Sequence, residues 1–437
     1  MAQTYKFGNG TWATKKGSTL AYNDENDNYK PLPFTTTRES RATRVNKEGL
    51  IEVVGNDVPR IDYTDSTEGV LLLEPQRTNL ITYSEDFSDA YWTKSGVSLT
   101  DGFISPDGTS NAFKLIEDGT NAFHGFYQNA NISLPIGKIT MSIFVKANGR
   151  DYFQLRTGSA AGITGAPLYA NFDLTNDSVT ATSSGVNDAK IESYTNNWKK
   201  ISISFTITSG SSASLVFQPI TTSSAAIGET YQGDGTSGVY IYGAQLEQGS
   251  YPTSYIPTNG STVTRLADAA NGSGNSEVFN DSEGVLFADI SALADDLTNR
   301  RITISDPSGQ NFVMINYTTT TNQVAYSYYV SGVYEVYLTE SISKITNNTK
   351  ISVSWSLNKF QMHINGFLVK EQLFGDLMTG DNLDNLRFSL WNGNDPFYGN
   401  TKQIQYHNSV LTDSELEQLT SWDSFIDMAT SQLYTIQ

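Results

Sequence analysis

The side chains that could carry out covalent or acid–base chemistry are few in this chain, apart from the carboxylates. There are three histidines, His124, His363 and His407, and no cysteine in 437 residues. None of the histidines lies in an H-E-x-x-H motif or beside a G-x-S-x-G turn, so neither a zinc peptidase nor a hydrolase nucleophile elbow is indicated. A Ser-His-Asp triad assembles in space and stays open, but no pattern of residues favours one. The lack of cysteine excludes disulfides, thiolate nucleophiles and cysteine metal sites.

Carboxylates are abundant, and glycoside hydrolysis is a reaction that needs only carboxylates. Two Asp or Glu side chains that face each other across a cleft are sufficient for it, and the chain has 46 acidic residues. Such pairs therefore arise by chance, and the E-x-D-x-x-E strand motif of laminarinase-type jelly rolls does not occur. We expect a protein that is not an enzyme, with a polysaccharide depolymerase as the less favoured alternative.

One segment in the C-terminal part of the chain has the side chains that sugar binding requires. Aromatic faces stack against pyranose rings, and planar polar groups bind hydroxyls. The glycan-binding candidates in the segment WNGNDPFYGN are Trp391, Asn392, Asp395 and Tyr398. A second aromatic set, on two adjacent predicted strands, consists of Tyr326, Tyr328, Tyr334 and Tyr337. Aromatic residues of a β-sandwich also occupy cores and cross-strand pairs, which is the alternative interpretation.

The sequence predicts no metal site and no cofactor. Asp24 and Asp27 offer oxygen ligands for calcium, but their spacing departs from the D-x-[DN]-x-[DN]-G loop. Asn392, Asn394 and Asp395 form a second oxygen-rich set that is equally weak. A solvated acidic loop is the better interpretation of the first set.

The balance of charge limits the classes of partner that the chain can bind. With 28 basic and 46 acidic side chains the net charge is −18, which is the opposite of what a phosphate-binding groove needs, so we expect no nucleic acid. The N-terminal segment MAQTYKFGNG lacks the apolar core of a signal peptide, and no window approaches 18 apolar residues. We therefore expect neither signal-peptide secretion nor membrane insertion.

Strand patterns dominate the elements that must position these side chains. Residues 201 to 207 alternate apolar with polar types, which places the apolar side chains on one face. Asn365-Gly366 marks a tight hairpin between two strands, and a short helix after it is capped by Thr412 or Asp413, with Glu415 following. We expect Trp92, Trp198 and Trp355 in the cores. The sequence predicts an all-β fold of tandem antiparallel β-sandwiches.

A chain of this length should divide into two or three domains. The predicted regions are an N-terminal attachment or oligomerisation arm at 1–83, a first jelly-roll sandwich at 84–258, a linker at 259–280 and a second sandwich at 281–437. The arm has few apolar residues, so it should become ordered only against partners or neighbouring subunits. The linker contains the flexible composition NGSGNS.

Three arginines lie within seven residues of the arm, at Arg38, Arg41 and Arg44. In a chain this acidic we expect them to bind carboxylates elsewhere in an assembly, which makes them candidates for attachment. A solvated surface is the alternative.

The blocks around these arginines resemble a known family. The first block contains SRATRVNKEGLIE, VPRIDYT and GVLLLEPQRTNLITYSEDF, followed by Trp92, and the second is GVYIYGAQLEQGSYPTSYIPTNGSTVTRL. Their order is similar to a module of tailed-bacteriophage virion proteins, a head spike or fibre domain, and the two blocks bracket residues 38 to 266. The hairpin and capped helix that close the chain are similar to those of concanavalin A-like or laminin-G-like jelly rolls, which often bind sugars.

The resemblance implies a structural protein of the virion, assembled in the host bacterial cytoplasm and exposed outside the particle. A head fibre or spike is the first expectation, and a tail-associated receptor-binding fibre is the alternative. The implied partners are other virion proteins of the capsid or tail, two further copies in a homotrimer, and glycans of the host surface or the environment.

Overall fold

The chain folds into two compact units, and the computed structural model describes residues 4–24, 29–128, 132–160, 162–380, 382–431 and 434–435. Unit 1 comprises Met1–Ser40, Gly55–Pro75 and Ala267–Gln437. Unit 2 comprises Arg41–Val54 and Gln76–Leu266. The chain therefore leaves unit 1 twice and returns to it twice.

Unit 1 contains two large antiparallel sheets. The first has ten strands: β37 (Phe367–Gln372), β36 (Lys359–Ile364), β35 (Thr349–Ser356), β30 (Gly284–Ala292), β39 (Gly399–His407), β1 (Tyr5–Gly8), β4 (Tyr22–Asn23) and β5 (Lys30–Pro31) in that order, with β10 (Val70–Leu73) beside β39 and β9 (Ile61–Asp62) beside β10. The second has nine, in the order β2 (Thr14–Lys15), β3 (Ser18–Thr19), β6 (Phe34–Thr37), β29 (Ala269–Ser273), β38 (Asn385–Arg387), β31 (Arg300–Ser305), β32 (Phe312–Tyr317), β33 (Gln323–Val330) and β34 (Val333–Ser341).

The core of unit 1 lies between these two sheets. Leu286, Ala288 and Ile290 of β30 face Ile302 and Ile304 of β31 in one buried apolar cluster. The alternation of apolar and polar residues along each strand assigns one face to this core and the other to the outside.

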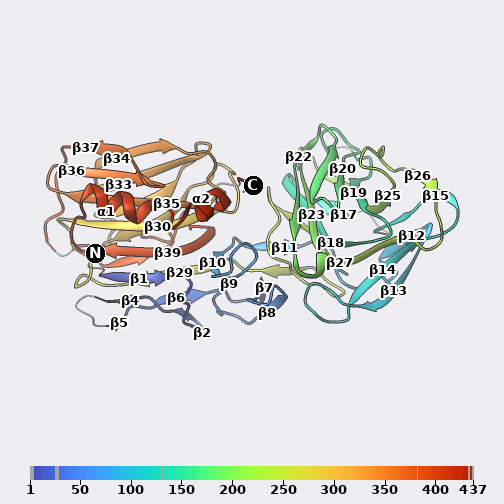
Figure 1. Ribbon diagram of the computed structural model, residues 1–437, viewed down its shortest axis with the longest axis horizontal. Coiled ribbons are helices and arrows are strands. Elements are labelled where there is room, and N and C mark those ends of the chain that lie inside the picture. Colours follow the sequence, from blue (N-terminus) through green and yellow to red (C-terminus); the bar gives the residue numbers. More distant parts are fainter. Residues whose placement is uncertain are drawn as a thin grey trace. The chain divides into compact units, whose positions relative to one another are not determined.

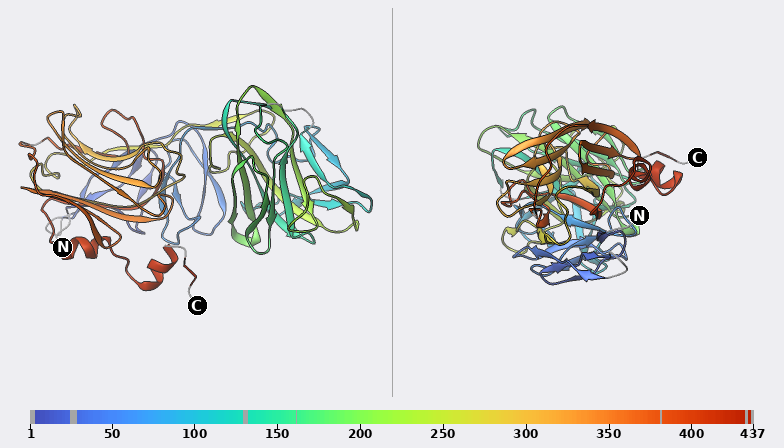
Figure 2. Two further views of the ribbon diagram at one scale, coloured as in Figure 1. Left: turned by 90° about the horizontal axis from the view of Figure 1, so that it is seen from above. Right: turned by 90° about the vertical axis from the view of Figure 1, so that its left-hand side faces the viewer.

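Two helices follow the last strand of unit 1. Helix α1 (Asp413–Thr420) begins with a capping box, in which the Thr412 side chain accepts from the Glu415 amide and the Glu415 side chain accepts from the Thr412 amide. Helix α1 packs over β35, β36 and β37, and α2 (Phe425–Ser431) follows it on the outside of the sandwich (Figure 2). No helix of the described residues is both long and apolar enough to cross a membrane.

Unit 2 is a second antiparallel sandwich. One six-stranded sheet has the order β12 (Trp92–Ser95), β16 (Gly125–Gln128), β25 (Leu215–Ile220), β19 (Tyr152–Thr157), β20 (Tyr169–Asp173) and β21 (Ser178–Thr182). The other has the order β13 (Val97–Phe103), β14 (Ala112–Glu117), β27 (Gly238–Gln248), β18 (Gly137–Asn148), β23 (Lys199–Ile207) and β22 (Val186–Ser193). Their inner faces share one apolar core.

Smaller elements complete unit 2. The two-stranded ribbons are β7 (Ala42–Val45) with β8 (Ile51–Val54), β11 (Arg77–Asn79) with β28 (Val263–Arg265), β15 (Asn121–Phe123) with β26 (Thr230–Gln232), and β17 (Ile132–Leu134) with β24 (Ser211–Ala213). A 3₁₀ turn at Thr195–Asn197 precedes β23. The β7–β8 ribbon buries Val45 and Ile51 against Trp198 and Tyr255.

The predicted fold class, tandem antiparallel β-sandwiches of the jelly-roll, concanavalin A-like class, is confirmed. Asn365 and Gly366 form the two-residue loop between β36 and β37, both at positive φ, as a type I′ hairpin turn requires. Trp92, Trp198 and Trp355 are buried as expected.

The N-terminal segment differs from the free-standing arm that its composition predicts. Strand β1 pairs antiparallel with β39 from the other end of the chain, with Tyr5 opposite Tyr406 (Figure 1). Residues of β1, β6 and β10 enter the core of unit 1, among them Phe7, Phe34 and Leu71. The few apolar residues of this segment are sufficient because the sheets of the same chain, rather than a partner, cover them.

The expected linker at 259–280 also contains strands. Val263–Arg265 forms β28 in unit 2, and Ala269–Ser273 forms β29 between β6 and β38 of unit 1. The passage between the units lies between Leu266 and Ala267. Of the acidic stretch from Asn23 to Asn28, residues 25–28 lie outside the described residues; Asp24 pairs with Lys6 at 2.9 Å.

Candidate functional site

The outer face of the nine-stranded sheet is polar where the inner face is apolar. Along β31, Ile302 and Ile304 enter the core, while Arg301, Thr303 and Ser305 point to the opposite face. We call this opposite face, across β29, β38, β31, β32, β33 and β34, the outer polar face.

The strand register aligns one row of residues across the outer polar face. Thr303 lies opposite Arg387 of β38 on one side and Met314 of β32 on the other, and Met314 lies opposite Ser327 of β33. Ser327 in turn lies opposite Tyr337 of β34. Directly opposite residues in antiparallel strands project to the same face. The row therefore has a guanidinium at one end and a phenol at the other, with the buried residues Thr303, Met314 and Ser327 between them.

Several polar atoms of this face have hydrogen-bonding capacity that the protein does not use. The buried atoms without a hydrogen-bond partner are Arg301 Nε, Thr303 Oγ1, Ser305 Oγ, Asn316 Oδ1, Ser327 Oγ, Asn385 Oδ1 and Arg387 Nε. Buried polar atoms are normally paired, so a group of unpaired atoms on one face calls for an explanation, such as a ligand or water.

Aromatic side chains occupy the β32–β34 end of the outer polar face. Phe312 and Tyr329 stack at 4.5 Å between ring centroids, and Tyr329 contacts Tyr334 at 4.7 Å. Tyr334 and Tyr337 are 52% and 54% exposed, so their ring faces remain available for stacking.

The structure divides the four tyrosines that the sequence grouped together. Tyr326 and Tyr328 point into the core, where their hydroxyls donate to the carbonyls of Ser354 and Asp281. Burial raises the pKa of both phenols. Tyr329, the next residue, points to the outer polar face because side chains alternate along the strand, and an irregularity in β34 at Glu335 places Tyr334 opposite it. Tyr329, Arg301 and Arg387 were missed by the sequence analysis, although the alternation in RRITIS was a usable signal.

The predicted glycan-binding segment borders this face only in part. Asp395 Oδ2 lies 3.2 Å from Arg301 Nη2, and Trp391 lies against Gly309 in the turn between β31 and β32, where a Cβ would clash with the indole. Asn392 is exposed and caps its own turn by accepting from the Asn394 amide. Tyr398 is half-buried against the core of unit 1. The structure thus brings Asp395 to the polar face, and holds Tyr398 elsewhere.

The three arginines proposed for attachment have different surroundings. Arg38 is 1% exposed, and its guanidinium donates to Asp268 Oδ1 at 2.9 Å and to the carbonyls of Ser40, Val58 and Gly55. Its charge is therefore satisfied inside unit 1 and is not presented to a partner.

Arg41 and Arg44 belong to unit 2. Arg44 pairs across the β7–β8 ribbon with Glu52 at 2.6 Å, and Arg41 is exposed beside a small groove lined by Thr43, Val53 and Tyr255. Attachment through these two residues stays a prediction.

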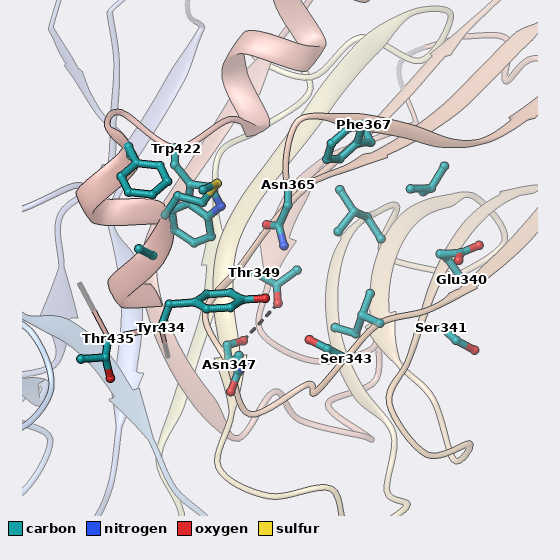
Figure 3. A pocket seen from close by; sticks show the side chains of 16 residues that line it. Glu340, Ser341, Ser343, Asn347, Thr349, Asn365, Phe367, Trp422, Tyr434 and Thr435 are labelled. Atoms are coloured by element: carbon teal, nitrogen blue, oxygen red, sulfur yellow. Dashed lines mark hydrogen bonds between the residues drawn. The ribbon is translucent and has the colours of Figure 1, made fainter. Parts of the chain in front are cut away.

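A separate cavity of about 900 Å³ lies in unit 1 between the β36–β37 hairpin, the end of β34 and the segment that carries α2 (Figure 3). Its walls are largely apolar, with Phe367, Trp422 and Phe425 among them. Glu340 is the single carboxylate among the described lining residues, and it pairs with Lys370 at 3.1 Å. The cavity does not supply the two free carboxylates that glycoside hydrolysis needs.

The described residues contain no group of three or more His, Asp or Glu side chains placed to hold a metal ion. His124 is held by the carbonyls of Gly96 and Tyr231. His363 is buried on the side of the ten-stranded sheet that α1 covers; burial lowers its pKa, and neither ring nitrogen has a hydrogen-bond partner within the described ranges. Neither histidine forms part of a hydrogen-bonded Ser-His-Asp triad.

The chain matches no protein-family model and no curated protein. Among solved structures it is similar to the CBM40 domain of the Ruminococcus gnavus IT-sialidase, at 15% identity and a TM-score of 0.29 over 35% of this chain and 94% of that domain. The same domain bound to alpha2,3 sialyllactose matches at 14% identity and a TM-score of 0.30, with the same coverage. Domains LG4-5 of the mouse laminin alpha1 chain match at 8% identity and a TM-score of 0.24, over 64% of this chain and 86% of theirs. Similarity at this level carries no argument about the ligand of this chain.

Proposed function

We propose that this chain is a non-catalytic structural protein that binds glycans on the outer polar face of unit 1. The observation that carries this proposal is the row from Arg387 to Tyr337, which has a half-buried guanidinium at one end and exposed aromatic rings at the other. Sugar rings bind through stacking on aromatic faces combined with hydrogen bonds to their hydroxyls. The outer polar face offers exposed aromatic rings at one end and guanidinium donors at the other, while Thr303 and Ser327 between them are fully buried.

A binding role fits this face better than catalysis. The carboxylate that reaches it is Asp395, and an arginine already pairs with it. A depolymerase would need a second carboxylate facing the first across the bound sugar. The residues named on the outer polar face include no such second group.

The first experiment is a glycan array probed with the full chain and with the double variant Tyr334→Ala/Tyr337→Ala. Because stacking on these rings contributes to sugar binding, we expect the double variant to lose binding about tenfold or more. Tyr29→Ala is the matched control, since Tyr29 is 77% exposed in unit 1 but is not part of the face. Unchanged binding by the double variant, or release of reducing ends from a bound polysaccharide, would contradict the proposal.

We further propose that the protein is a head fibre or spike of a phage particle, a homotrimer, with a tail-associated receptor-binding fibre as the alternative. The two sequence blocks that resemble virion proteins support this role, because they fold against each other. Strand β11 of the first block pairs with β28 of the second, and Thr43 Oγ1 donates to the Tyr255 carbonyl at 2.6 Å. The second block and the parts of the first at 41–54 and 76–87 thus belong to unit 2, whereas residues 58–64 and 69–75 of the first block belong to unit 1. The virion role itself rests on the resemblance.

Cryo-electron microscopy of the particle whose genome encodes this chain tests the location. Density for three copies on the capsid supports the head fibre. Density at the tail alone supports the receptor-binding fibre. Absence from the particle would refute both.

A further inference from the structure

Arg387 is a cation for which the described part of this strongly acidic chain supplies no counter-ion. Its side chain is half-buried on the outer polar face, and the described residues include no ion-pair or hydrogen-bond partner for its guanidinium. Other arginines of unit 1, such as Arg38, Arg60, Arg300 and Arg301, each pair with a carboxylate. With a net charge of −18 the chain has carboxylates in excess, yet no carboxylate of the described residues pairs with this arginine.

The charges on the outer polar face leave a net positive charge. Arg301 and Arg387 are diagonal neighbours, because Arg387 lies opposite Thr303 and Arg301 precedes Thr303 by two residues on the same face. Asp395 pairs with Arg301, so the two guanidinium groups have one carboxylate between them. A planar guanidinium binds a carboxylate with two parallel hydrogen bonds, a geometry that a lysine cannot reproduce.

We propose that the outer polar face selects acidic glycans, with the carboxylate of a sugar held by Arg387. The proposal rests on the glycan-binding function above and specifies its ligand class. Thr303, which lies directly beside Arg387 in the row, is fully buried, so the sugar contacts the half-buried guanidinium and not this hydroxyl.

The length of the row defines the size of the ligand. Arg387 and Tyr337 are separated by four strand spacings, from β38 through β31, β32 and β33 to β34, which is roughly 19 Å. A single sugar does not span this distance. The ligand that contacts both ends is therefore an oligosaccharide, with its acidic residue at the Arg387 end and a neutral residue stacked at the Tyr337 end.

The test compares each acidic glycan with its carboxyl-reduced form, in which the carboxylate has become a primary alcohol. The full chain is applied to an array of such matched pairs, with sulfated glycans included, and the strongest pair is then titrated by calorimetry. We expect the wild-type chain to bind the acidic member about tenfold or more tightly, because hydrogen bonds between charged groups are stronger than neutral ones. The preference should fall as salt is raised.

Variants assign the preference to Arg387. Arg387→Gln should bind both members of a pair equally, and Arg387→Lys should recover only part of the preference. Asp395→Asn should increase the affinity for acidic glycans several-fold, since it removes a repelling charge and releases Arg301. Lys47→Gln, which removes one charge from an exposed position of unit 2, should leave the preference unchanged.

The outcomes separate this inference from the function on which it rests. Equal binding of acidic and reduced glycans by the wild-type chain, a stronger preference for sulfated glycans, or a full preference in Arg387→Gln would overturn the inference and leave glycan binding intact. No binding to any glycan would overturn the proposed function as well. Thermal unfolding of Arg387→Gln at the wild-type temperature confirms that a lost preference does not reflect a lost fold.

Discussion

Two pairs of arginines in unit 1 show two different uses of the same side chain. Arg38 and Arg60, each 1% exposed, lie with Glu74 and Asp268 in a buried cluster that we call the internal ion cluster. Arg301 and Arg387 lie on the outer polar face with one carboxylate, Asp395. The first group is balanced in charge, and the second is not.

The difference follows from burial. A fully buried charge without a partner costs several kcal/mol, so each guanidinium of the internal ion cluster must have its carboxylate. Burial alone would lower the pKa of Arg60, but Asp268 and Glu74 together raise it, so it stays charged. On the half-exposed face the cost of an unbalanced charge is smaller, and the spare charge remains available to a ligand.

The place of the internal ion cluster in the sequence indicates what it stabilises. Arg38 precedes the first passage out of unit 1, Arg60 follows the first return, Glu74 precedes the second departure and Asp268 follows the second return. The cluster therefore joins the segments of unit 1 next to each point where the chain enters or leaves it.

Removing a charge from the internal ion cluster should cause the largest loss of folding stability. Arg60→Met leaves Glu74 and Asp268 buried with one cation, and we expect unit 1 to lose about 3–5 kcal/mol of stability. Native-state hydrogen exchange of the β1 and β39 amides measures this loss within unit 1. Arg387→Met is the matched control on the outer polar face and should change stability by less than about 1 kcal/mol. Equal losses in the two variants would remove the distinction between the two pairs.

Asp289 extends the comparison to a buried carboxylate whose cationic neighbours, among the described residues, are the lysines Lys350 and Lys402. Burial raises its pKa to about 6, against the opposing effect of Lys350 and Lys402, and Asn348 donates to it at 2.5 Å. Because the folded-state pKa lies above the unfolded value, this group's stabilisation is present at low pH and declines as the pH rises from about 4 through about 6.

Asp289→Asn should therefore stabilise the protein at pH 7.5 by about 2–3 kcal/mol and have little effect near pH 4. Thermal unfolding at both pH values measures the change, with the exposed Asp376→Asn as the control. If the unfolding temperatures of Asp289→Asn and the wild type changed in parallel with pH, the prediction would be wrong. Other groups would then neutralise this carboxylate.

The smallest loss of folding stability is expected when the surface ion pair of the β7–β8 ribbon is removed. Arg44 and Glu52 are 24% and 36% exposed, and Arg44→Ala should cost about 0.2–1 kcal/mol in urea unfolding of unit 2. A loss of particle attachment without a larger loss of stability would assign Arg44 to a partner. A loss of several kcal/mol would mean that the ribbon depends on this pair as unit 1 depends on its internal ion cluster.

Local features were predictable because their causes are local. The Asn365-Gly366 turn depends on two residues that accept positive φ, and the Thr412 cap depends on side-chain bonds within one helical turn. The site was predictable only in part. Trp391 and Asp395 were found from composition, whereas Arg387 has no local pattern that distinguishes it from any surface arginine.

By itself, the sequence determined the fold class, the tight turns, the helix cap and the core tryptophans, since alternation and turn chemistry act over a few residues. Only the tertiary structure decided that the N-terminal strand pairs with β39, that Arg38 is buried against Asp268, and that Arg387 and Tyr337 end one row. The physical reason is that pairing in a β-sheet joins residues that are far apart in the chain. Composition specifies which residues can be buried, but not which strand buries them.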